Sequence, residues 1–232
     1  MARAVKEKER TEKRNAILDA AQQLIYTKGY EQITIQDILD GLQISKGAFY
    51  HYFDSKQDLV DALIERMIEE VDRLMRPIAY DPQLPALEKI QRVFGTLNRW
   101  KTAQKEFLMK ILRVWYSDDN AIVRQKLLTL ALKQTTSLLV VMIYQGIEEG
   151  VMALSYPDQV SEVLLNLALG IGDTLGRLLL SEGPRRDNLL YAERLVAATN
   201  EALERILGAP TGSLHVTDPE ILREWFGTPE EV

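Results

Sequence analysis

Apolar residues recur at intervals of three and four along most of this 232-residue chain, and that spacing constrains the fold more than any other feature. Over residues 12–28, for example, one helical face carries Ile17, Ala20, Ala21, Leu24 and Ile25. No segment sustains the alternation of apolar and polar residues that predicts a strand. We therefore predict an all-α fold.

Capping and helix-breaking residues set the predicted helix boundaries. Gly29 ends the first helix, because glycine readily adopts the left-handed conformation found at helix ends. Residues able to cap the next three helices stand at Thr34, Ser45 and Ser55. The predicted helices cover 12–28, a short segment from residue 34 to a break over 41–43, 46–53, 56 to about 75, 86–103, 105–116, 118–149, 158–181 and 187–207, with a proline-rich linker over 76–85 and a tail over 211–232. One apolar turn in the tail, 221–226, is expected to pack on the body or on a partner.

Three helices lie within the first fifty-odd residues, with a tight turn between the second and the third. This layout is typical of a helix-turn-helix unit. We predict a helix-turn-helix DNA-binding domain over 1–56, with a basic N-terminal extension, and a larger helical domain over 57–232.

The distribution of charge supports this division. The chain carries a net charge of −6, but residues 1–56 carry +1 and the remainder carries −7. The basic surplus is concentrated between Arg3 and Arg14, so phosphate groups are best tolerated near the N-terminus. Two interpretations of this basic start stay open: a solvated helix end, or an arm that contacts phosphate or the minor groove.

Residue types that catalytic and metal sites need are scarce. The chain has no cysteine and two histidines, His51 and His215. These counts exclude disulfides, thiol nucleophiles and cysteine-bound zinc, and no Ser-His-Asp constellation or glycine-rich phosphate loop can be assembled. We expect no enzyme activity, no cofactor and no metal. The charged start and the shortness of apolar runs such as Leu138–Tyr144 lead us to expect a cytoplasmic protein without a membrane span.

The segment 33–56, ITIQDILDGLQISKGAFYHYFDSK, carries the most specific signal. On a helix over 46–53, Phe49 faces the small core of the unit, and four residues point outward: Lys46, Gly47, Tyr50 and His51. A major groove admits one helix, whose N-terminal residues reach the base edges. The bare backbone at Gly47 permits close approach to the bases or to the sugar-phosphate wall.

Over about residues 10–60 the chain resembles the DNA-binding domain of the TetR/AcrR family. The resemblance lies in Thr34 at the start of the second helix, Ile44-Ser45-Lys46-Gly47, the aromatic run Phe49-Tyr50-His51-Tyr52-Phe53, and Ser55-Lys56. It implies phosphate contacts from Thr34, Tyr52 and Lys56, and it implies that Lys46, Gly47, Ala48, Tyr50 and His51 lie in or beside the groove. Ser45 is added as a candidate, because the amide end of the helix that it caps can receive phosphate.

Three positions depart from the pattern of the family. Leu39 and Gln43 stand where a small residue and a glycine are common, so we expect Gln43 to adopt an unusual backbone conformation. Ala48 replaces a frequent Thr or Ser, which removes one hydroxyl contact and puts the operator sequence in doubt, but not DNA binding itself.

Two late helices have apolar faces suited to packing against another helix pair. Gly172 and Gly176 stand four apart and permit close approach. From spacing alone, an internal core explains these faces equally well. The resemblance favours a four-helix bundle between two subunits, with the candidate interface residues Leu167, Ile171, Leu175, Leu178, Tyr191, Leu195, Ala198 and Ala202.

Aromatic and flexible residues are concentrated between the linker and these two helices, and most of them are expected in the core. Apolar pockets lined by aromatic side chains suit small hydrophobic ligands. The resemblance implies an inducer pocket among the middle helices, with the candidates Phe94, Trp100, Phe107, Trp115, Tyr116, Met142 and Tyr144.

Taken together, the residues and the resemblance predict a homodimeric repressor that binds a palindromic operator and is released by a small hydrophobic or amphipathic ligand. A transcriptional activator of the same fold stays open as an alternative. So does a ligand-independent DNA-binding or scaffolding protein, although the net negative charge disfavours it.

Overall fold

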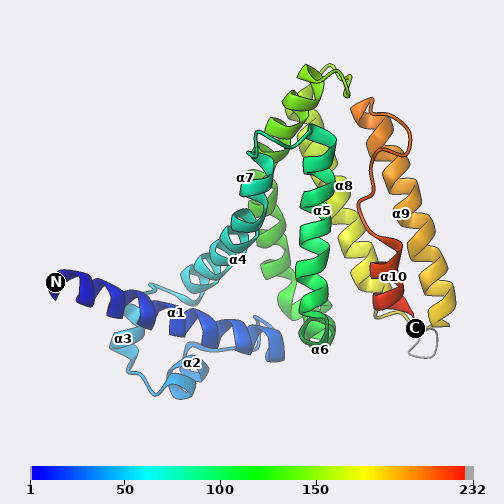
Figure 1. Cartoon of the computed structure of the whole chain (residues 1–232). Helices are drawn as coiled ribbons and strands as arrows, with labels where there is room; N and C mark the ends of the chain where they lie inside the picture. The colour runs from blue at the N-terminus through cyan, green and yellow to red at the C-terminus, as the bar shows by residue number, and fades with distance from the viewer. Residues whose placement is uncertain (1, 228–232) are drawn as a thin grey trace. The chain divides into compact units, whose positions relative to one another are not determined.

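The computed structural model describes residues 2–227 of the chain (Figure 1). The regular elements among these residues are ten α-helices and one short 3₁₀ helix, without a strand, which confirms the all-α prediction. The chain forms two compact units. Three helices contribute residues to both units: α4 (Lys56–Ala79), α6 (Lys105–Tyr116) and α7 (Ala121–Glu148).

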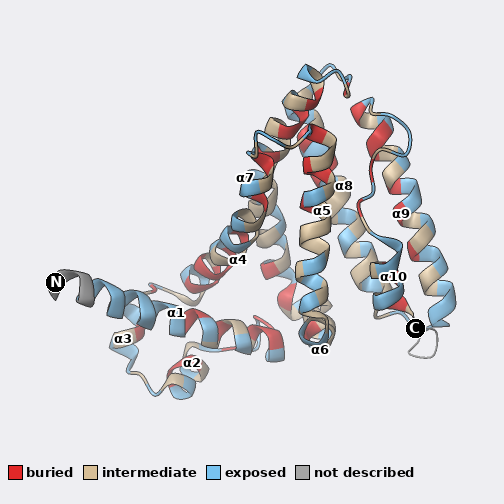
Figure 2. Ribbon diagram, in the orientation of Figure 1, coloured by how far each residue is buried: buried red, intermediate tan, exposed pale blue. Residues whose placement is uncertain are grey.

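The first unit comprises the chain up to Ile68 together with Ile111–Leu130. It contains α1 (Ala2–Lys28), α2 (Ile35–Leu42), α3 (Lys46–Tyr50), the start of α4, and the short helix η1 (Asp118–Asn120) with the adjoining ends of α6 and α7. Its core is formed by apolar side chains from the inward faces of these helices: Leu18, Ile25, Ile38, Phe49, Phe53, Leu59 and Leu63. In α1 residues 6–16 are exposed and the buried positions begin at Ile17, so the C-terminal half of this helix packs on the core (Figure 2).

A buried amide ties the end of α1 to η1. The side chain of Asn120 has no solvent exposure. Its Oδ1 accepts a hydrogen bond from the backbone amide of Tyr30 at 2.8 Å, and its Nδ2 donates to the carbonyl of Val114 at 3.0 Å. The backbone amide of Glu31 also donates to the carbonyl of Asp119 at 3.1 Å. These bonds hold the loop after α1 against the segment 111–130, which is distant in sequence.

The second unit comprises Glu69–Lys110 and the chain from Ala131 onward. It adds α5 (Ala86–Ala103), α8 (Pro157–Leu178), α9 (Arg185–Leu207) and α10 (Pro219–Phe226) to the remaining parts of α4, α6 and α7. α9 packs against both α8 and α10. The core gathers apolar residues from most of these helices: Ile90, Leu138, Met142, Ile143, Leu164, Leu203, Leu222 and Phe226.

The described part of the predicted tail packs on the second unit. The indole N–H of Trp225 donates to the hydroxyl of Thr102 at 2.9 Å. Glu204 is buried, and its carboxylate accepts the backbone amide of Leu214 at 2.9 Å. Burial opposes the charged form of Glu204, but hydrogen bonds from the backbone amides of residues 212–214 outweigh it and lower the pKa. Residues 228–232 of the predicted tail lie outside the described residues.

Several helix boundaries differ from the prediction. α1 begins at Ala2 instead of residue 12, α3 ends at Tyr50 instead of 53, α8 ends at Leu178 instead of 181, and α4 continues through Pro77 into the predicted linker. Pro77 lacks only one backbone donor, and the helix closes after it because the amide of Tyr80 donates to the carbonyl of Arg76 at 3.1 Å. α5 and α6 have the predicted bounds. The functional boundary predicted after residue 56 stays a prediction.

Within the described residues, Asp118–Glu148 is the one stretch whose length and apolar composition would allow it to cross a membrane. Its side chains instead contribute to both cores. Val123 is buried in the part of α7 that belongs to the first unit, and Leu138, Met142 and Ile143 are buried in the core of the second. These contacts favour the interpretation of α7 as a core helix.

Replacing Asn120 by alanine tests the tie between α1 and η1. We expect Asn120→Ala to lower the free energy of unfolding by about 1–3 kcal/mol, because the amide of Tyr30 loses its buried acceptor. Thermal and urea unfolding followed by circular dichroism measure the change. Gln125→Ala, at an exposed position of α7, is the control and should unfold like the wild type. Equal midpoints for both variants would show that Asn120 does not hold the loop.

Candidate nucleic-acid interface

A reciprocal capping box opens α2. The hydroxyl oxygen of Thr34 accepts the backbone amide of Asp37 at 3.1 Å, and the carboxylate of Asp37 accepts the backbone amide of Thr34 at 2.7 Å. Hydrogen bonds from the Thr34 hydroxyl, then its backbone amide, and from the ammonium of Lys28 lower the pKa of Asp37 to about 2. Asp37 is therefore ionised at neutral pH and accepts these bonds, and Thr34 is exposed at the start of α2.

The turn between α2 and α3 contains a non-glycine residue in the left-handed region. Gln43 has a φ of 53° and a ψ of 41°, which confirms the unusual conformation expected from the missing glycine. Its amide donates to the carbonyl of Asp40, and the amide of Ile44 donates to the carbonyl of Leu39 at 3.1 Å. The bulkier Leu39 is accommodated because its side chain is buried in the core of the unit.

Two buried phenylalanines set the rotation of α3. Phe49 and Phe53 are almost fully buried, and their ring centroids lie 5.9 Å apart. Ser45 caps the helix, because its hydroxyl accepts the backbone amide of Ala48 at 3.2 Å. With the phenylalanines inward, the opposite face of α3 is exposed to solvent, as the spacing of the sequence predicts.

The exposed face of α3 combines a cation, a bare backbone and two rings with polar atoms. Lys46, Gly47 and His51 are exposed, and Tyr50 exposes 42% of its surface. The ammonium of Lys46 lies 5.9 Å from the centroid of the Tyr50 ring. This face can donate and accept hydrogen bonds toward a polar, anionic surface.

The other predicted contact residues border this face. Ala48 and Tyr52 are partly exposed and line a hollow of about 230 Å³ together with Lys13 of α1. Lys56, at the start of α4, is also partly exposed, and its ammonium lies 4.2 Å from the centroid of the Tyr30 ring. The structure thus brings the nine predicted residues into one unit, within reach of solvent. The position of Lys13 beside α3 was not predicted.

The residues predicted to line a ligand pocket are divided between the two units. Trp115 and Tyr116 belong to the first unit and the other five to the second. Met142 is buried in the core, and Tyr144 is exposed, with its hydroxyl 3.4 Å from a carboxylate oxygen of Asp158. Phe94 and Trp100 are partly buried. The predicted pocket stays a prediction.

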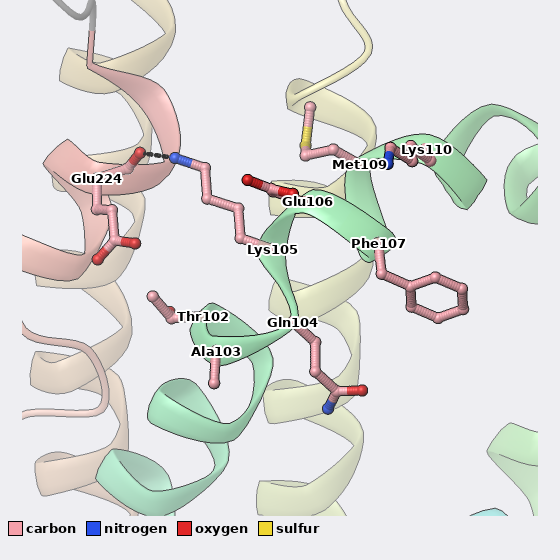
Figure 3. Close-up of a pocket in the computed structure, with 9 residues that line it drawn as sticks. All are labelled: Thr102, Ala103, Gln104, Lys105, Glu106, Phe107, Met109, Lys110 and Glu224. Atoms are coloured by element: carbon pink, nitrogen blue, oxygen red, sulfur yellow. Dashed lines mark hydrogen bonds between the residues drawn. The ribbon is translucent and has the colours of Figure 1, made fainter.

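One open hollow of about 880 Å³ lies at the corner between α5 and α6 (Figure 3). Its wall mixes polar and apolar side chains, and the ring of Phe107 points away from the opposite wall formed by Glu224 of α10. The ammonium of Lys105 reaches across to the backbone carbonyl of Glu224. In the described part of the chain, no three His, Asp or Glu side chains lie together as metal ligands would.

The residues predicted to form a dimer interface divide by exposure. Tyr191 and Ala198 are exposed on α9, and the other six, Leu167, Ile171, Leu175, Leu178, Leu195 and Ala202, are partly buried. Two further large apolar residues are exposed on the same helices, Val163 of α8 and Leu190 of α9. Leu190 is not among the predicted interface residues, because it is adjacent to Tyr191 and not at a helical spacing from it.

Comparison with known proteins agrees with the local geometry. Residues 17–63 match the model of the family described as bacterial regulatory proteins, tetR family. An uncharacterized HTH-type transcriptional regulator in the lacX 3' region of Lactococcus lactis subsp. lactis is 49% identical over 53 residues, which are 23% of this chain and 27% of that protein. The HTH-type transcriptional repressor KstR2 of Mycobacterium tuberculosis is 32% identical over 82 residues, 35% of this chain and 40% of the repressor. These two matches therefore cover well under half of each relative.

Solved structures extend the likeness over most of the chain. A TetR-family transcriptional regulator from Pectobacterium atrosepticum superposes with a TM-score of 0.58 at 19% identity, over 88% of this chain and 98% of that one. At this identity the likeness concerns the fold alone. Residues 17–63 therefore carry the helix-turn-helix domain of the TetR family of bacterial regulatory proteins, and the fold resembles that of a solved TetR-family regulator.

Proposed function

We propose that this protein is a DNA-binding transcriptional regulator that inserts α3 of each of two subunits into the major groove of a palindromic operator. The observation that carries the proposal is the rotation of α3, in which Phe49 is buried and Lys46 and Tyr50 are exposed. A major groove about 12 Å wide accepts one helix in this way. Lys46 is suited to guanine acceptors, and Tyr50 to a phosphate or a thymine edge.

Gly47 supports this assignment, because nothing inside the protein requires a glycine there. A Cβ at this position would meet no atom closer than Ser45 Oγ at 4.0 Å, and its backbone lies outside the left-handed region. Glycine inside a helix costs up to about 1 kcal/mol relative to alanine. Close approach of an external surface gives a reason for that cost.

Phosphate contacts from Thr34, Tyr52 and Lys56 would fix the register of α3 in the groove. Lys56 is suited to this role, because an ammonium group has three donors. Its ammonium lies over the Tyr30 ring and donates a long hydrogen bond of 3.5 Å to the carbonyl of Glu31. The capped start of α3 at Ser45 adds backbone amides that favour an anion.

A homodimer through α8 and α9 is the second part of the proposal. Val163, Leu190 and Tyr191 each expose about half of their surface on these two helices. Burying them against a second copy removes apolar surface from water. Two linked recognition helices also make binding to the second half-site intramolecular, which raises the operator affinity.

We further propose that the protein is a cytoplasmic repressor released by a small hydrophobic or amphipathic ligand. KstR2, one of the relatives, is named as a repressor. α4, α6 and α7 are continuous helices with residues in both units. A ligand that shifts these helices in the second unit would therefore also shift their residues in the first. Such a ligand lowers the DNA affinity only to the extent that it binds the conformation that cannot bind DNA more tightly than the conformation that can.

Substitution of the exposed pair on α3 tests the DNA contact. We expect Lys46→Ala/Tyr50→Ala to weaken binding to the promoter region of the protein's own gene at least about tenfold, since removing a side chain that binds a base costs about 1–3 kcal/mol. Footprinting and a salt series measure the affinity. The control is Lys133→Ala/Tyr80→Ala, which removes the same side chains from exposed positions of the second unit. Wild-type affinity in the α3 variant, with an intact dimer, would refute the assignment of this face.

A charge placed on α9 tests the dimer. Tyr191→Glu should yield monomers in analytical ultracentrifugation and weaken operator binding roughly 100-fold, because a monomer can bind only one half-site at a time. Tyr80→Glu is a matched control, since Tyr80 exposes 52% of its surface and Tyr191 exposes 53%. The interface is elsewhere if Tyr191→Glu remains as dimeric as this control.

A further inference from the structure

The turns of α1 over residues 6–16 lie outside the core of the first unit. α1 runs from Ala2 to Lys28, yet its buried residues begin at Ile17, and the side chains of residues 6–16 are all exposed. A separate helix of this length is marginal in water, so these turns are helical because they continue the packed half. The side chains of residues 6–16 do not contribute to the core, so they are available to an external partner.

Basic residues form a stripe on one face of these turns. Lys6, Arg10 and Lys13 are separated by four and three residues, and Ile17 follows four residues later, so all four share one helical face. Lys8 and Glu12 lie on the opposite face, where they form an ion pair at 3.8 Å. The three cations therefore lie on the same face of α1 as the buried Ile17, toward the N-terminus of the helix.

This face lies on the same side of α1 as α3. Lys13 and Ile17 line the 230 Å³ hollow together with Ala48 and Tyr52, two of the residues proposed to border DNA. The guanidinium of Arg14 lies 5.2 Å from the centroid of the Phe53 ring. The basic stripe thus begins beside α3, and Figure 1 shows the N-terminal turns of α1 continuing past that helix.

We propose that Lys6, Arg10 and Lys13 form a second DNA-binding surface, which binds the phosphate backbone of the duplex that flanks each half-site. This inference rests on the proposed function and extends it. Lys13 to Lys6 spans about 10 Å at 1.5 Å per residue, which corresponds to about three base pairs of duplex. Cations that bind phosphates in this way add affinity without reading sequence.

The composition of these turns favours DNA over an anionic membrane. Residues 6–16, KEKERTEKRNA, contain no large apolar side chain. An amphipathic helix that lies in a membrane surface needs an apolar face to bury. Phosphates of a duplex need only the cations, and the continuity of the stripe with the α3 surface favours the same partner for both.

The test compares two triple variants of the full-length protein. Lys6→Gln/Arg10→Gln/Lys13→Gln removes the stripe. Lys8→Gln/Lys133→Gln/Arg223→Gln removes three exposed cations elsewhere and is the matched control. The probe is a duplex that the wild-type protein selects from a random-sequence library, prepared in two lengths, one ending at the half-sites and one with ten or so further base pairs on each side.

The stripe variant should bind the long duplex with a weaker salt dependence. The slope of log affinity against log salt should fall by about 0.9 for each phosphate that the variant no longer neutralises. The stripe variant should also bind the long and the short duplex equally, unlike the wild type, while it keeps the preference for the selected sequence. The control variant should keep both the slope and the length preference.

Three results would overturn the inference. A wild type that selects no duplex refutes the proposed function, and the inference with it. A stripe variant with the slope and the length preference of the control refutes the inference alone. Loss of binding to phosphatidylglycerol vesicles in the stripe variant, with unchanged binding to DNA, would assign the stripe to a membrane.

Discussion

The burial of Phe49 and Phe53 is the interaction on which the proposed DNA-binding surface depends. α3 has only five residues, too few to hold an orientation by its own hydrogen bonds, so the two rings determine which residues face solvent. A rotation of about 100°, one residue's worth, would replace Tyr50 with a neighbour on the exposed face. The position of the helix, in contrast to its rotation, depends on the caps at Thr34 and Ser45 and on the turn at Gln43. The packing of the two phenylalanines therefore also determines which residues of α3 are available to contact DNA.

Much of the fold was predictable, because its signals are local. A helix-breaking residue and the apolar face that follows it lie within one or two turns, and α5, which begins directly after Pro85, has the predicted bounds for this reason. Errors arose where tertiary contacts override local preference. Pro77 is typical of a helix breaker, yet α4 continues past it to Ala79, a fully buried residue whose carbonyl accepts the ammonium of Lys89 at 2.9 Å. Asn120 follows Ser117-Asp118-Asp119 in a polar turn, and that context gave no sign that its side chain would be buried and hold the loop after α1.

The exposed face of α3 could be predicted from the sequence, whereas the walls of a pocket could not, also for a physical reason. The residues of α3 are neighbours in sequence, so helical geometry alone assigns their faces. A pocket would draw Phe94, Trp115 and Met142 from three helices, and the apolar character of a residue does not distinguish a wall from a core. Met142 is almost fully buried and Trp115 belongs to the other unit. Lys13 escaped prediction because its relation to Ala48 depends on how α1 packs on α3, which no local spacing encodes.

Two positions near the start of α3 have residues that the internal structure does not explain. Gly47 stands where a side chain would fit, and Gln43 stands where the left-handed backbone favours glycine. Gln43 holds a left-handed conformation at a cost of about 1 kcal/mol that glycine would avoid. Gly47 has open space around its Cα and a backbone that any residue adopts. Both choices lower stability, and both lie close together in the turn and at the start of α3. Stability of the free protein does not account for either, whereas an outer surface that must approach the start of α3 accounts for the bare backbone at Gly47.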